Sequence, residues 1–449
     1  MSIEGVWESR GYGWVMELSS SGYALFDNTP HACIEFERGT AAEFDAGFEV
    51  LARDSRDHLA ICVRHDITRY DFDRIDQVPE DALYLGQDRE TCPALNLEFF
   101  CDAFAQDYAF FDLRGLDWEE ASAFSKTRIH EDSSPDELFE VLHELIQPLR
   151  DNHVHLTDGT RTVNSERLAD IKALLQTELP LRSASIGDPY KVGKIGAFVD
   201  NEFLGGEGRL AGNGAVIWGL VAPTVGYLNV LKFFGLTDTE FGRTATDLPP
   251  RRPDHGRRLR EDLEKIEEIM DQAMADIGDA NAVILDVRLN GGGFDKLGMA
   301  IAGRFTDKKR PAFSKHARFG AGVTDSQQFF LEPHGKSQFT RPVYVLTSAR
   351  TASAGDIFAM CMRSLPNVTL VGQPSTGILS DNLKKHLPNG WTTSLSNEYY
   401  CSTDGQLFEG PGVPVDVETP VFVQDDFRAG YHVAFDKALE MALANVTKV

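Results

Sequence analysis

The chain has 449 residues, enough for large buried cores and for two to four domains. Lys and Arg number 44 against 69 Asp and Glu, which gives a net charge of −25, and a field of this sign repels phosphate backbones. Nucleic acid is therefore not expected as a partner. Hydrophobic residues make up 42% of the chain and charged residues 25%, a composition that excludes a largely disordered protein.

The N-terminal sequence MSIEGVWESRGYGW has no basic start followed by an apolar run, so no signal peptide is predicted. Six cysteines are too sparse for a disulfide framework. Both features favour a cytoplasmic protein with free thiols, and export stays open if the sequence is trimmed. The apolar stretch Gly214–Leu236 is interrupted by Pro223 and is rich in β-branched and aromatic residues, which favours two buried strands over a membrane span. No membrane association is expected.

Residues 1–93 alternate short apolar runs with Gly, Asn, Asp and Pro, which predicts a small, barrel-like antiparallel β domain. We expect it to be a scaffold without a catalytic role. Residues 94–163 change to helical periodicity, with a helix that begins near Ser133–Asp136 and ends at Pro148. Residues 164–213 form a variable linker in which Ser165–Leu179 predicts a helix.

Residues 214–449 alternate strands and helices, as α/β proteins do. Two apolar strands in this part end in small or polar residues and are followed by helices, within Ala282–Phe294 and Pro342–Met360. Because ligands and catalytic groups collect at this edge of α/β sheets, the two loops are expected to lie close together.

The first of these loops carries Gly291, Gly292 and Gly293. Glycines can adopt backbone conformations closed to other residues and present amide hydrogens to an oxyanion. A flexible turn is the alternative. A phosphate-binding loop is excluded because no Gly-Lys-Ser/Thr follows.

The second loop carries Ser353 in the run Thr-Ala-Ser-Ala-Gly-Asp, at the start of a predicted helix. Amides at a helix N-terminus stabilise developing negative charge, so this position suits a nucleophile. A helix N-cap is an equally good interpretation of the local pattern.

A serine nucleophile needs a base, and His153 in LRDNHVHLTDG is the best candidate. His155 would share one face with it on a strand, where the two could bind a metal. No third ligand is evident, so neither a metal nor a cofactor is expected. Hydrogen-bonded loop residues remain the alternative for both histidines.

Seven motifs together resemble the tail-specific, or C-terminal processing, serine peptidases and the related tricorn-core peptidases. In chain order they are YAFFDLRGLDW, LRDNHVHL, VGYLNVLKFFG, AVILDVRLNGGG, VLTSARTASAGD, LVGQPSTG and DGQLFEGPGVPVDVE. They cover the chain from about Phe104 to the C-terminus, and their order and spacing agree with the family.

The resemblance implies an α/β fold with a crotonase-like core of repeated β-β-α units. It also implies a Ser-His-Glu site like that of the tricorn-like branch, with Ser353 as nucleophile, His153 as base and Glu409 orienting the histidine. The implied oxyanion hole consists of one glycine of the triple, preferably Gly292, and the amide of Ala354. Residues with possible supporting roles are Gly291, Gly293, Asn152 and Asp356.

Three positions depart from the family pattern. Ile378 stands where the processing branch carries its catalytic lysine, and Asn152 stands where some tricorn-like members carry a serine. Asp356 replaces the usual glutamate three residues after the nucleophile. Lys384 and Lys385 follow nearby, but their context predicts a solvated turn. We therefore expect a histidine base rather than a lysine.

The predicted function is hydrolysis of peptide bonds through an acyl-enzyme, with a peptide or protein as substrate and oligomerisation possible. A ligand-binding protein of the same architecture is one alternative, because a fold does not determine function. An esterase or amidase for small molecules would use the same groups and is the other.

Overall fold

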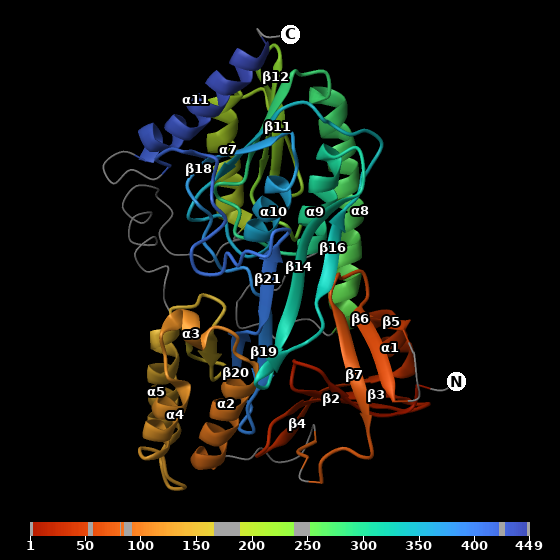
Figure 1. Ribbon diagram of the computed structural model, residues 1–449, viewed down its shortest axis with the longest axis vertical. Coiled ribbons are helices and arrows are strands. Elements are labelled where there is room, and N and C mark those ends of the chain that lie inside the picture. Colours follow the sequence, from red (N-terminus) through yellow and green to blue (C-terminus); the bar gives the residue numbers. More distant parts are fainter. Residues whose placement is uncertain are drawn as a thin grey trace.

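The computed structural model describes residues 3–52, 57–80, 82–84, 92–165, 189–237, 252–421 and 427–446. Figure 1 shows an elongated molecule, with the C-terminal helix at one end and the N-terminal strands at the other. Within the described ranges, no helix combines the length and the apolar character needed to cross a membrane. The helix expected over residues 165–179 falls, except for Ser165, outside these ranges.

A seven-stranded sheet forms the centre of the α/β part. Its spatial order is β10 (Arg209–Ala211), β11 (Val216–Ala222), β12 (Val225–Val230), β13 (Ala282–Asp286), β17 (Val343–Thr347), β18 (Val368–Gly372) and β22 (Val417–Glu418). The five strands from β12 to β22 are parallel, and β10 and β11 join antiparallel at one edge. The strand pair predicted within Gly214–Leu236 is confirmed as β11 and β12.

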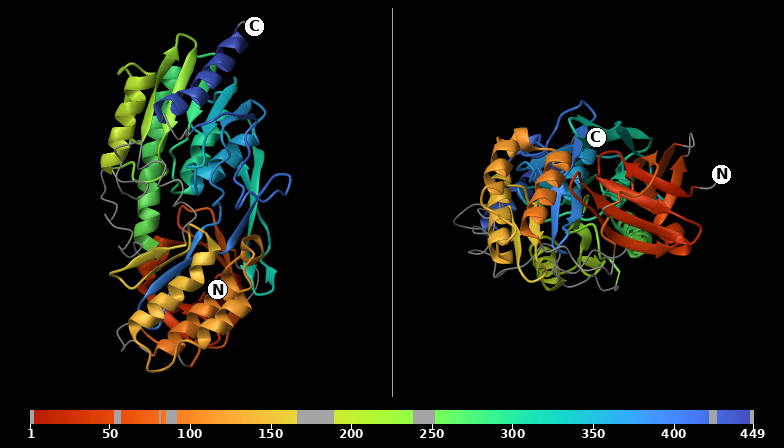
Figure 2. Two further views of the ribbon diagram at one scale, coloured as in Figure 1. Left: turned by 90° about the vertical axis from the view of Figure 1, so that its left-hand side faces the viewer. Right: turned by 90° about the horizontal axis from the view of Figure 1, so that it is seen from below.

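Helices cover both faces of this sheet, which explains why its central strands are continuous apolar runs. One group consists of α7 (Pro189–Phe203) and α11 (Phe427–Val446), joined by the Phe203–Phe435 ring contact. The other consists of α8 (Arg252–Ile277), α9 (Asp295–Ala302) with the 3-10 turn η2 (Gly303–Phe305), and α10 (Ala354–Arg363). Figure 2 shows α11 lying across the sheet on the side away from α8. The α/β class expected for this part of the chain is confirmed.

The N-terminal strands form a second, wholly antiparallel sheet of seven strands. Its order is β4 (Cys33–Thr40), β3 (Gly22–Asn28), β2 (Trp14–Leu18), β1 (Gly5–Ser9), β7 (Arg69–Ile75), β6 (His58–Val63) and β5 (Phe48–Ala52). Helix α1 (Ala41–Gly47) connects its two outermost strands, β4 and β5. The antiparallel sheet is as expected.

Helices α2 (Pro93–Asp107), α3 (Phe111–Arg114), α4 (Trp118–Lys126) and α5 (Pro135–Ile146), with the 3-10 turn η1 (Gln147–Leu149), follow the N-terminal sheet. Helix α5 begins where the sequence predicts, because Ser134 caps it through a capping box with Glu137. The N-terminal sheet and these helices share one hydrophobic core, which also takes in Leu383 and Leu395 from the C-terminal third of the chain. The boundaries expected at residues 93, 163 and 213 stay predictions.

Two smaller sheets connect the parts. One has the order β19 (Asn382–His386), β20 (Thr392–Ser396), β8 (His155–Thr157) and β9 (Thr162–Asn164). The other centres on the long strand β14 (Arg310–Phe319), which pairs with β15 (Gly322–Val323), β16 (Gln327–Leu331) and β21 (Glu398–Ser402). In Figure 1, β14 and β21 run from the α/β part down to the N-terminal sheet.

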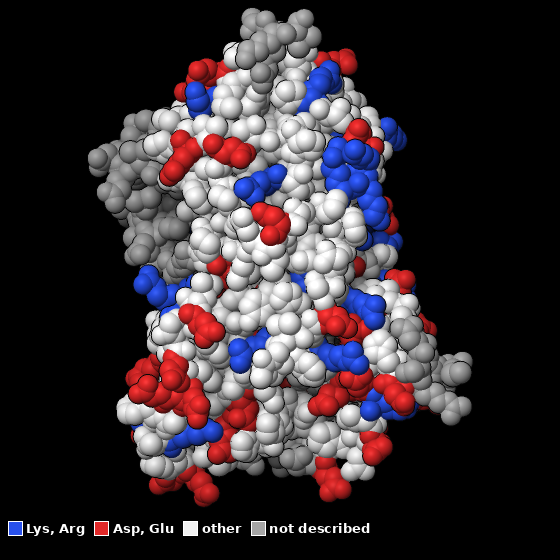
Figure 3. Space-filling model, viewed as in Figure 1, with Lys and Arg blue, Asp and Glu red and all other residues white. Residues whose placement is uncertain are grey.

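Acidic side chains predominate on the face seen in Figure 3, above all over its lower part, where Figure 1 places α4 and α5. This distribution accords with the net charge of −25. Such a field favours cationic over anionic molecules near the protein.

Lys385, on a strand from the C-terminal third of the chain, makes buried polar contacts with the N-terminal sheet and with helix α2. The sequence expectation of a solvated turn at Lys384 and Lys385 is wrong, because both lie on β19 and Lys385 is fully buried. Its Nζ lies 2.8 Å from Asp107 Oδ2 and 3.8 Å from Asp27 Oδ1, and donates to the Tyr12 carbonyl at 2.6 Å. One ammonium group therefore joins β19 to helix α2 and to the N-terminal sheet.

Replacing Lys385 with methionine should destabilise the protein by about 3–5 kcal/mol, because the buried Asp107 carboxylate would lose its ammonium partner and Asp27 would retain only His386. Urea denaturation measures this difference. Lys308→Met, at an exposed position, is the matched control and should change stability by less than about 0.5 kcal/mol. Equal stability of the two variants would contradict the structural role of Lys385.

Candidate active site

The parallel pairing of β13 with β17 brings the two predicted loops together. Register pairs such as Asp286 with Leu346 place the carboxyl ends of both strands at one edge of the sheet. The loops then contact each other directly, because the Ala352 amide donates to the Asn290 carbonyl at 2.9 Å. The expectation that these loops are neighbours is confirmed.

Ser353 lies at the N-cap position of α10, in a backbone conformation that side chains rarely adopt. Its φ is 56° and its ψ is −124°, and strained positions of this kind concentrate at functional sites. The Ser353 amide donates to Asp356 Oδ2 at 2.8 Å, so the helix's own first turn holds the strained residue in place. The side chain lines a cavity of about 320 Å³.

The glycine loop packs against Ser353 more closely than any side chain would permit. A Cβ added to Gly292, at φ 100°, would lie 2.8 Å from Ser353 Cβ and 3.0 Å from the Ala354 nitrogen. A Cβ on Gly293, at φ 137°, would lie 2.5 Å from the Phe233 carbonyl oxygen. The structure therefore requires glycine at both positions.

The preference for Gly292 as the oxyanion donor needs correction. Its amide already donates to Asn290 Oδ1 at 2.8 Å. Gly293 is instead the glycine of the triple that lines the cavity beside Ser353. No hydrogen bond of its amide occurs within the described part of the chain. Gly291 does not line the cavity.

Asp356 joins the nucleophile to a second loop, residues 375–380. Its carboxylate accepts hydrogen bonds from the amides of Gly377 at 2.9 Å and Ile378 at 3.3 Å, in addition to that of Ser353. Burial raises the pKa of the Asp356 carboxyl to about 6, although hydrogen bonds from Ser375 and the three amides oppose the rise. The carboxylate therefore sets the position of Ser353 relative to this loop.

Glu409 holds the other end of the same loop. Its Oε2 accepts hydrogen bonds from the amides of Leu379 at 2.7 Å and Ser380 at 3.1 Å. Its Oε1 lies 3.4 Å from Nη2 of Arg114, and the same guanidinium nitrogen lies 3.7 Å from Asp151 Oδ2. Burial and the neighbouring Asp151 raise the pKa of the Glu409 carboxyl.

His153 follows Asp151 in a turn before β8. Its amide donates to Asp151 Oδ1 at 3.0 Å, so the loop that carries it is fixed close to Arg114 and Glu409. Its ring forms no hydrogen bond with Ser353 or Glu409, and Nδ1 is buried without a partner in the described structure. The structure thus places Glu409 near the His153 loop but does not close the Ser-His-Glu hydrogen-bond chain.

Asn152 and His155, which flank His153 in the sequence, differ from it in their contacts. Asn152 buries its Nδ2, which finds no partner among the described residues. His155 is hydrogen bonded through Nδ1 to Ser394 Oγ. Burial and the nearby Lys384 lower the pKa of His155 to about 4, so its ring is neutral around pH 7. This finding favours the structural interpretation of His155.

Most residues of the cavity wall could not be predicted as site residues from the sequence. Asp66 and Thr68 come from the N-terminal sheet region, more than two hundred residues before Ser353. His255, Asp295 and Asp381 also line the cavity. No local motif marks these positions, because only the docking of the sheets brings them together. The N-terminal sheet region thus supplies part of the wall around Ser353, and the expectation that it has no catalytic role stays a prediction.

The raised pKa of Asp356 predicts a pH dependence of stability. A carboxyl that holds its proton more tightly in the folded state stabilises the protein below its unfolded pKa, and this contribution is lost as the pH rises through the folded pKa. For Asp356 this loss of stability falls in the pH range between the unfolded pKa of 3.8 and the folded pKa of about 6. Between about pH 5 and pH 7, wild type should therefore lose roughly 1 kcal/mol more unfolding free energy than Asp356→Asn.

Urea denaturation at both pH values tests this difference. Asp295 and Glu409 also have raised pKa values. Both residues are present in wild type and in the variant, so their contributions to the pH dependence of stability cancel. Asp132→Asn, at an exposed position, is the matched control and should retain the wild-type loss. An Asp356→Asn variant with the same loss as wild type would exclude the raised pKa.

Sequence comparison shows which known proteins this chain resembles. Residues 224–419 match the family model described as Peptidase family S41. The carboxy-terminal processing protease CtpA of Bacillus subtilis (strain 168) is 25% identical over 139 residues, 31% of this chain and 28% of CtpA. Tricorn protease of Thermoplasma volcanium is 26% identical over 175 residues, 37% of this chain and 15% of that protein. The alignments thus span less than a third of each of these two relatives.

A solved structure shares the fold over most of its length. It is a protein from Parabacteroides merdae assigned as a peptidase, 21% identical, with a TM-score of 0.60 over 79% of this chain and 98% of that chain. Fold, loop geometry and the family match agree. Residues 224–419, less than half of this chain, thus match the model of peptidase family S41, and the chain is similar to a C-terminal processing protease.

Proposed function

We propose that this protein is a serine peptidase that hydrolyses peptide bonds through an acyl-enzyme on Ser353. The observation that carries the proposal is the position of Ser353. It stands in a strained conformation at the start of α10, against a glycine loop, and lines a cavity of about 320 Å³. Enzymes place activated nucleophiles in such settings. The family match over residues 224–419 supports the same chemistry.

In the proposed reaction Ser353 Oγ attacks the carbonyl carbon of the scissile peptide bond. The amides of Gly293 and Ala354 donate to the oxyanion that forms, and the Ala354 amide is additionally the first of α10. The serine proton passes to His153, which returns it to the leaving amine. Water then repeats the attack on the acyl-enzyme and releases the second product.

Glu409 is proposed to orient His153. Two amides occupy its Oε2, which leaves Oε1, the atom that faces Arg114, for a further contact. His153 Nδ1 is buried without a partner, and buried ring nitrogens normally have one. Catalytic hydrogen bonds often tighten only when substrate binds. We propose that His153 Nδ1–H then donates a hydrogen bond to Glu409 and keeps its proton, while Arg114 and Asp151 hold both groups in position.

We propose further that the β-β-α units of the core follow a crotonase-like superhelix. Peptides or proteins are the proposed natural substrates. The cytoplasmic location expected from the sequence stays a prediction.

Ser353→Ala should abolish turnover, with a loss of several orders of magnitude and little change in folding, because the variant removes only the attacking oxygen. The measurement combines labelling by a fluorophosphonate probe with cleavage of a peptide library. Wild type should be labelled once per chain, at Ser353. Ser364→Ala, at the opposite end of the same helix, where the hydroxyl donates to the Cys361 carbonyl, is the control that should keep the labelling. Full labelling of Ser353→Ala would refute the nucleophile.

The base can be identified by comparing His153 with Lys384. Burial lowers the pKa of the Lys384 ammonium group, so a serine-lysine mechanism needs a direct test. His153→Ala should slow acylation at least a thousandfold. Lys384→Ala should change it no more than a few-fold. The reverse order of the two variants would assign the base to Lys384.

A further inference from the structure

The cavity beside Ser353 has walls from both ends of the molecule. Asp66 and Thr68 enter it from the N-terminal sheet region, Asp295 from the start of α9, and Asp381 from the loop before β19. Phe234, Phe294 and Leu379 supply apolar surface. A volume of about 320 Å³ is within the range of small-ligand sites. The cavity can hold one long side chain next to the nucleophile.

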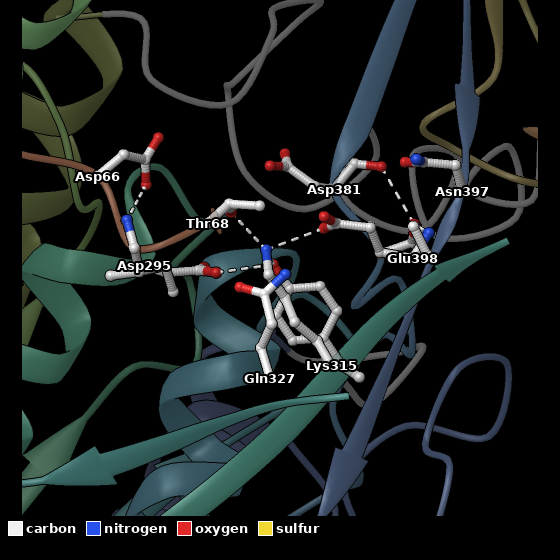
Figure 4. Close-up of polar contacts among 12 residues, drawn as sticks. Asp66, Thr68, Asp295, Lys315, Gln327, Asp381, Asn397 and Glu398 are labelled. Atoms are coloured by element: carbon white, nitrogen blue, oxygen red, sulfur yellow. Dashed lines mark hydrogen bonds and ion pairs between the residues drawn. The ribbon is translucent and has the colours of Figure 1, made fainter. Parts of the chain in front are cut away.

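A buried lysine, Lys315, contacts two residues of the cavity wall, Thr68 and Tyr400, and its hydrogen-bonding capacity is fully used. Lys315 Nζ donates to Thr68 Oγ1 at 2.5 Å, to Glu398 Oε2 at 3.0 Å and to the Tyr400 hydroxyl at 3.0 Å. An ammonium group has three hydrogens, so none is left for the cavity. Figure 4 shows the amine between Thr68 and Glu398. The charge of Lys315 is thereby paired with Glu398, which does not line the cavity.

Three carboxylates that do line the cavity keep acceptor capacity. Asp66 Oδ1 accepts the Ile67 amide at 2.7 Å, and its Oδ2 lies 3.5 Å from His255 Nε2. Asp295 accepts the Tyr400 hydroxyl at 3.0 Å. Among the described residues, the Asp381 carboxylate accepts one hydrogen bond, from the amide of the next residue, Asn382, at 2.8 Å. Each carboxylate can accept about four hydrogen bonds, so every one of them can bind a further donor.

The charges around the cavity do not balance. Three carboxylates line it, and the basic groups of the described lining residues are those of Arg258 and His255. The imbalance acts on Asp295, whose pKa is raised to about 7 by burial and by Asp381 and Asp66, against the opposing effect of Lys315. A cation that entered the cavity would relieve this repulsion.

We propose that this cavity is a specificity subsite for a cationic side chain, lysine or arginine, next to the scissile bond. This inference rests on the proposed function, because it takes Ser353 to be the nucleophile. The apolar walls contact the aliphatic stem, and the aromatic rings of Phe234 and Phe294 suit a cation as well. The carboxylates of Asp66 and Asp381 bind the charged end. The N-terminal sheet region thus contributes a specificity-determining residue, Asp66, to a site built mainly by the α/β part.

Direct binding tests the subsite without any need for turnover. Benzamidinium and benzamide have nearly the same shape but differ in charge, and both can be titrated calorimetrically into full-length Ser353→Ala protein. Benzamidinium should bind at least tenfold more tightly than benzamide. Asp66→Asn and Asp381→Asn should each remove most of this preference. Asp132→Asn, which removes one negative charge equally at an exposed site outside the cavity wall, should retain this preference.

Equal binding of the two compounds, or a preference that survives both Asp66→Asn and Asp381→Asn, overturns the proposal. Asp381 is exposed, so its variant should fold even if Asp66→Asn does not. Cleavage of paired peptides that carry lysine or norleucine at the scissile bond supplies the second measurement. The lysine peptide should have the higher kcat/KM by at least tenfold, and a norleucine preference also overturns the subsite. Cation binding without Ser353 labelling or cleavage would instead refute the peptidase function and leave the binding site standing.

Discussion

Two buried carboxylates, Asp356 and Glu409, hold the loop of residues 375–380 between them, and the candidate site depends on this arrangement. Asp356 accepts amides from the loop and from Ser353, whereas Glu409 accepts the next two amides of the loop and lies beside Arg114. Buried carboxylates are costly unless amides and cations satisfy them. The loop therefore has little freedom to move without exposing or orphaning one of the two carboxylates. Through these contacts the loop links Arg114, at the end of α3, to Ser353.

Buried lysines perform a similar task at the boundary between the N-terminal sheet and the rest of the chain. Lys385 pairs with Asp27 and Asp107, and Lys315 pairs with Glu398 while it binds Thr68. Both ammonium groups have carboxylate partners in the interior, where removal of one partner is far more costly than at the surface. These contacts are directional, unlike apolar packing. They fix the N-terminal sheet in one orientation, and Asp66 and Thr68 reach the cavity because of it.

Much of the fold could be predicted from the local sequence. Continuous β-branched runs such as Ala282–Asp286 and Val343–Thr347 identify strands covered on both faces. The capping box at Ser134 sets the start of α5. Lys385 shows where such reasoning fails. Two adjacent lysines look solvated in a one-dimensional pattern, and only the surrounding Asp27 and Asp107, hundreds of residues away in the sequence, make the buried position tolerable.

The sequence by itself determined the strand–loop–helix units around Gly291–Gly293 and Ser353, because turn geometry, strand periodicity and helix starts are local properties of the chain. Their proximity followed from the parallel sheet. Only the tertiary structure decided that the Gly292 amide is occupied by Asn290, that Glu409 and Asp356 share one loop, and that Asp66 lies in the cavity wall. These features depend on atoms brought together across long stretches of chain, and hydrogen bonding and charge pairing at that range leave no local pattern in the sequence.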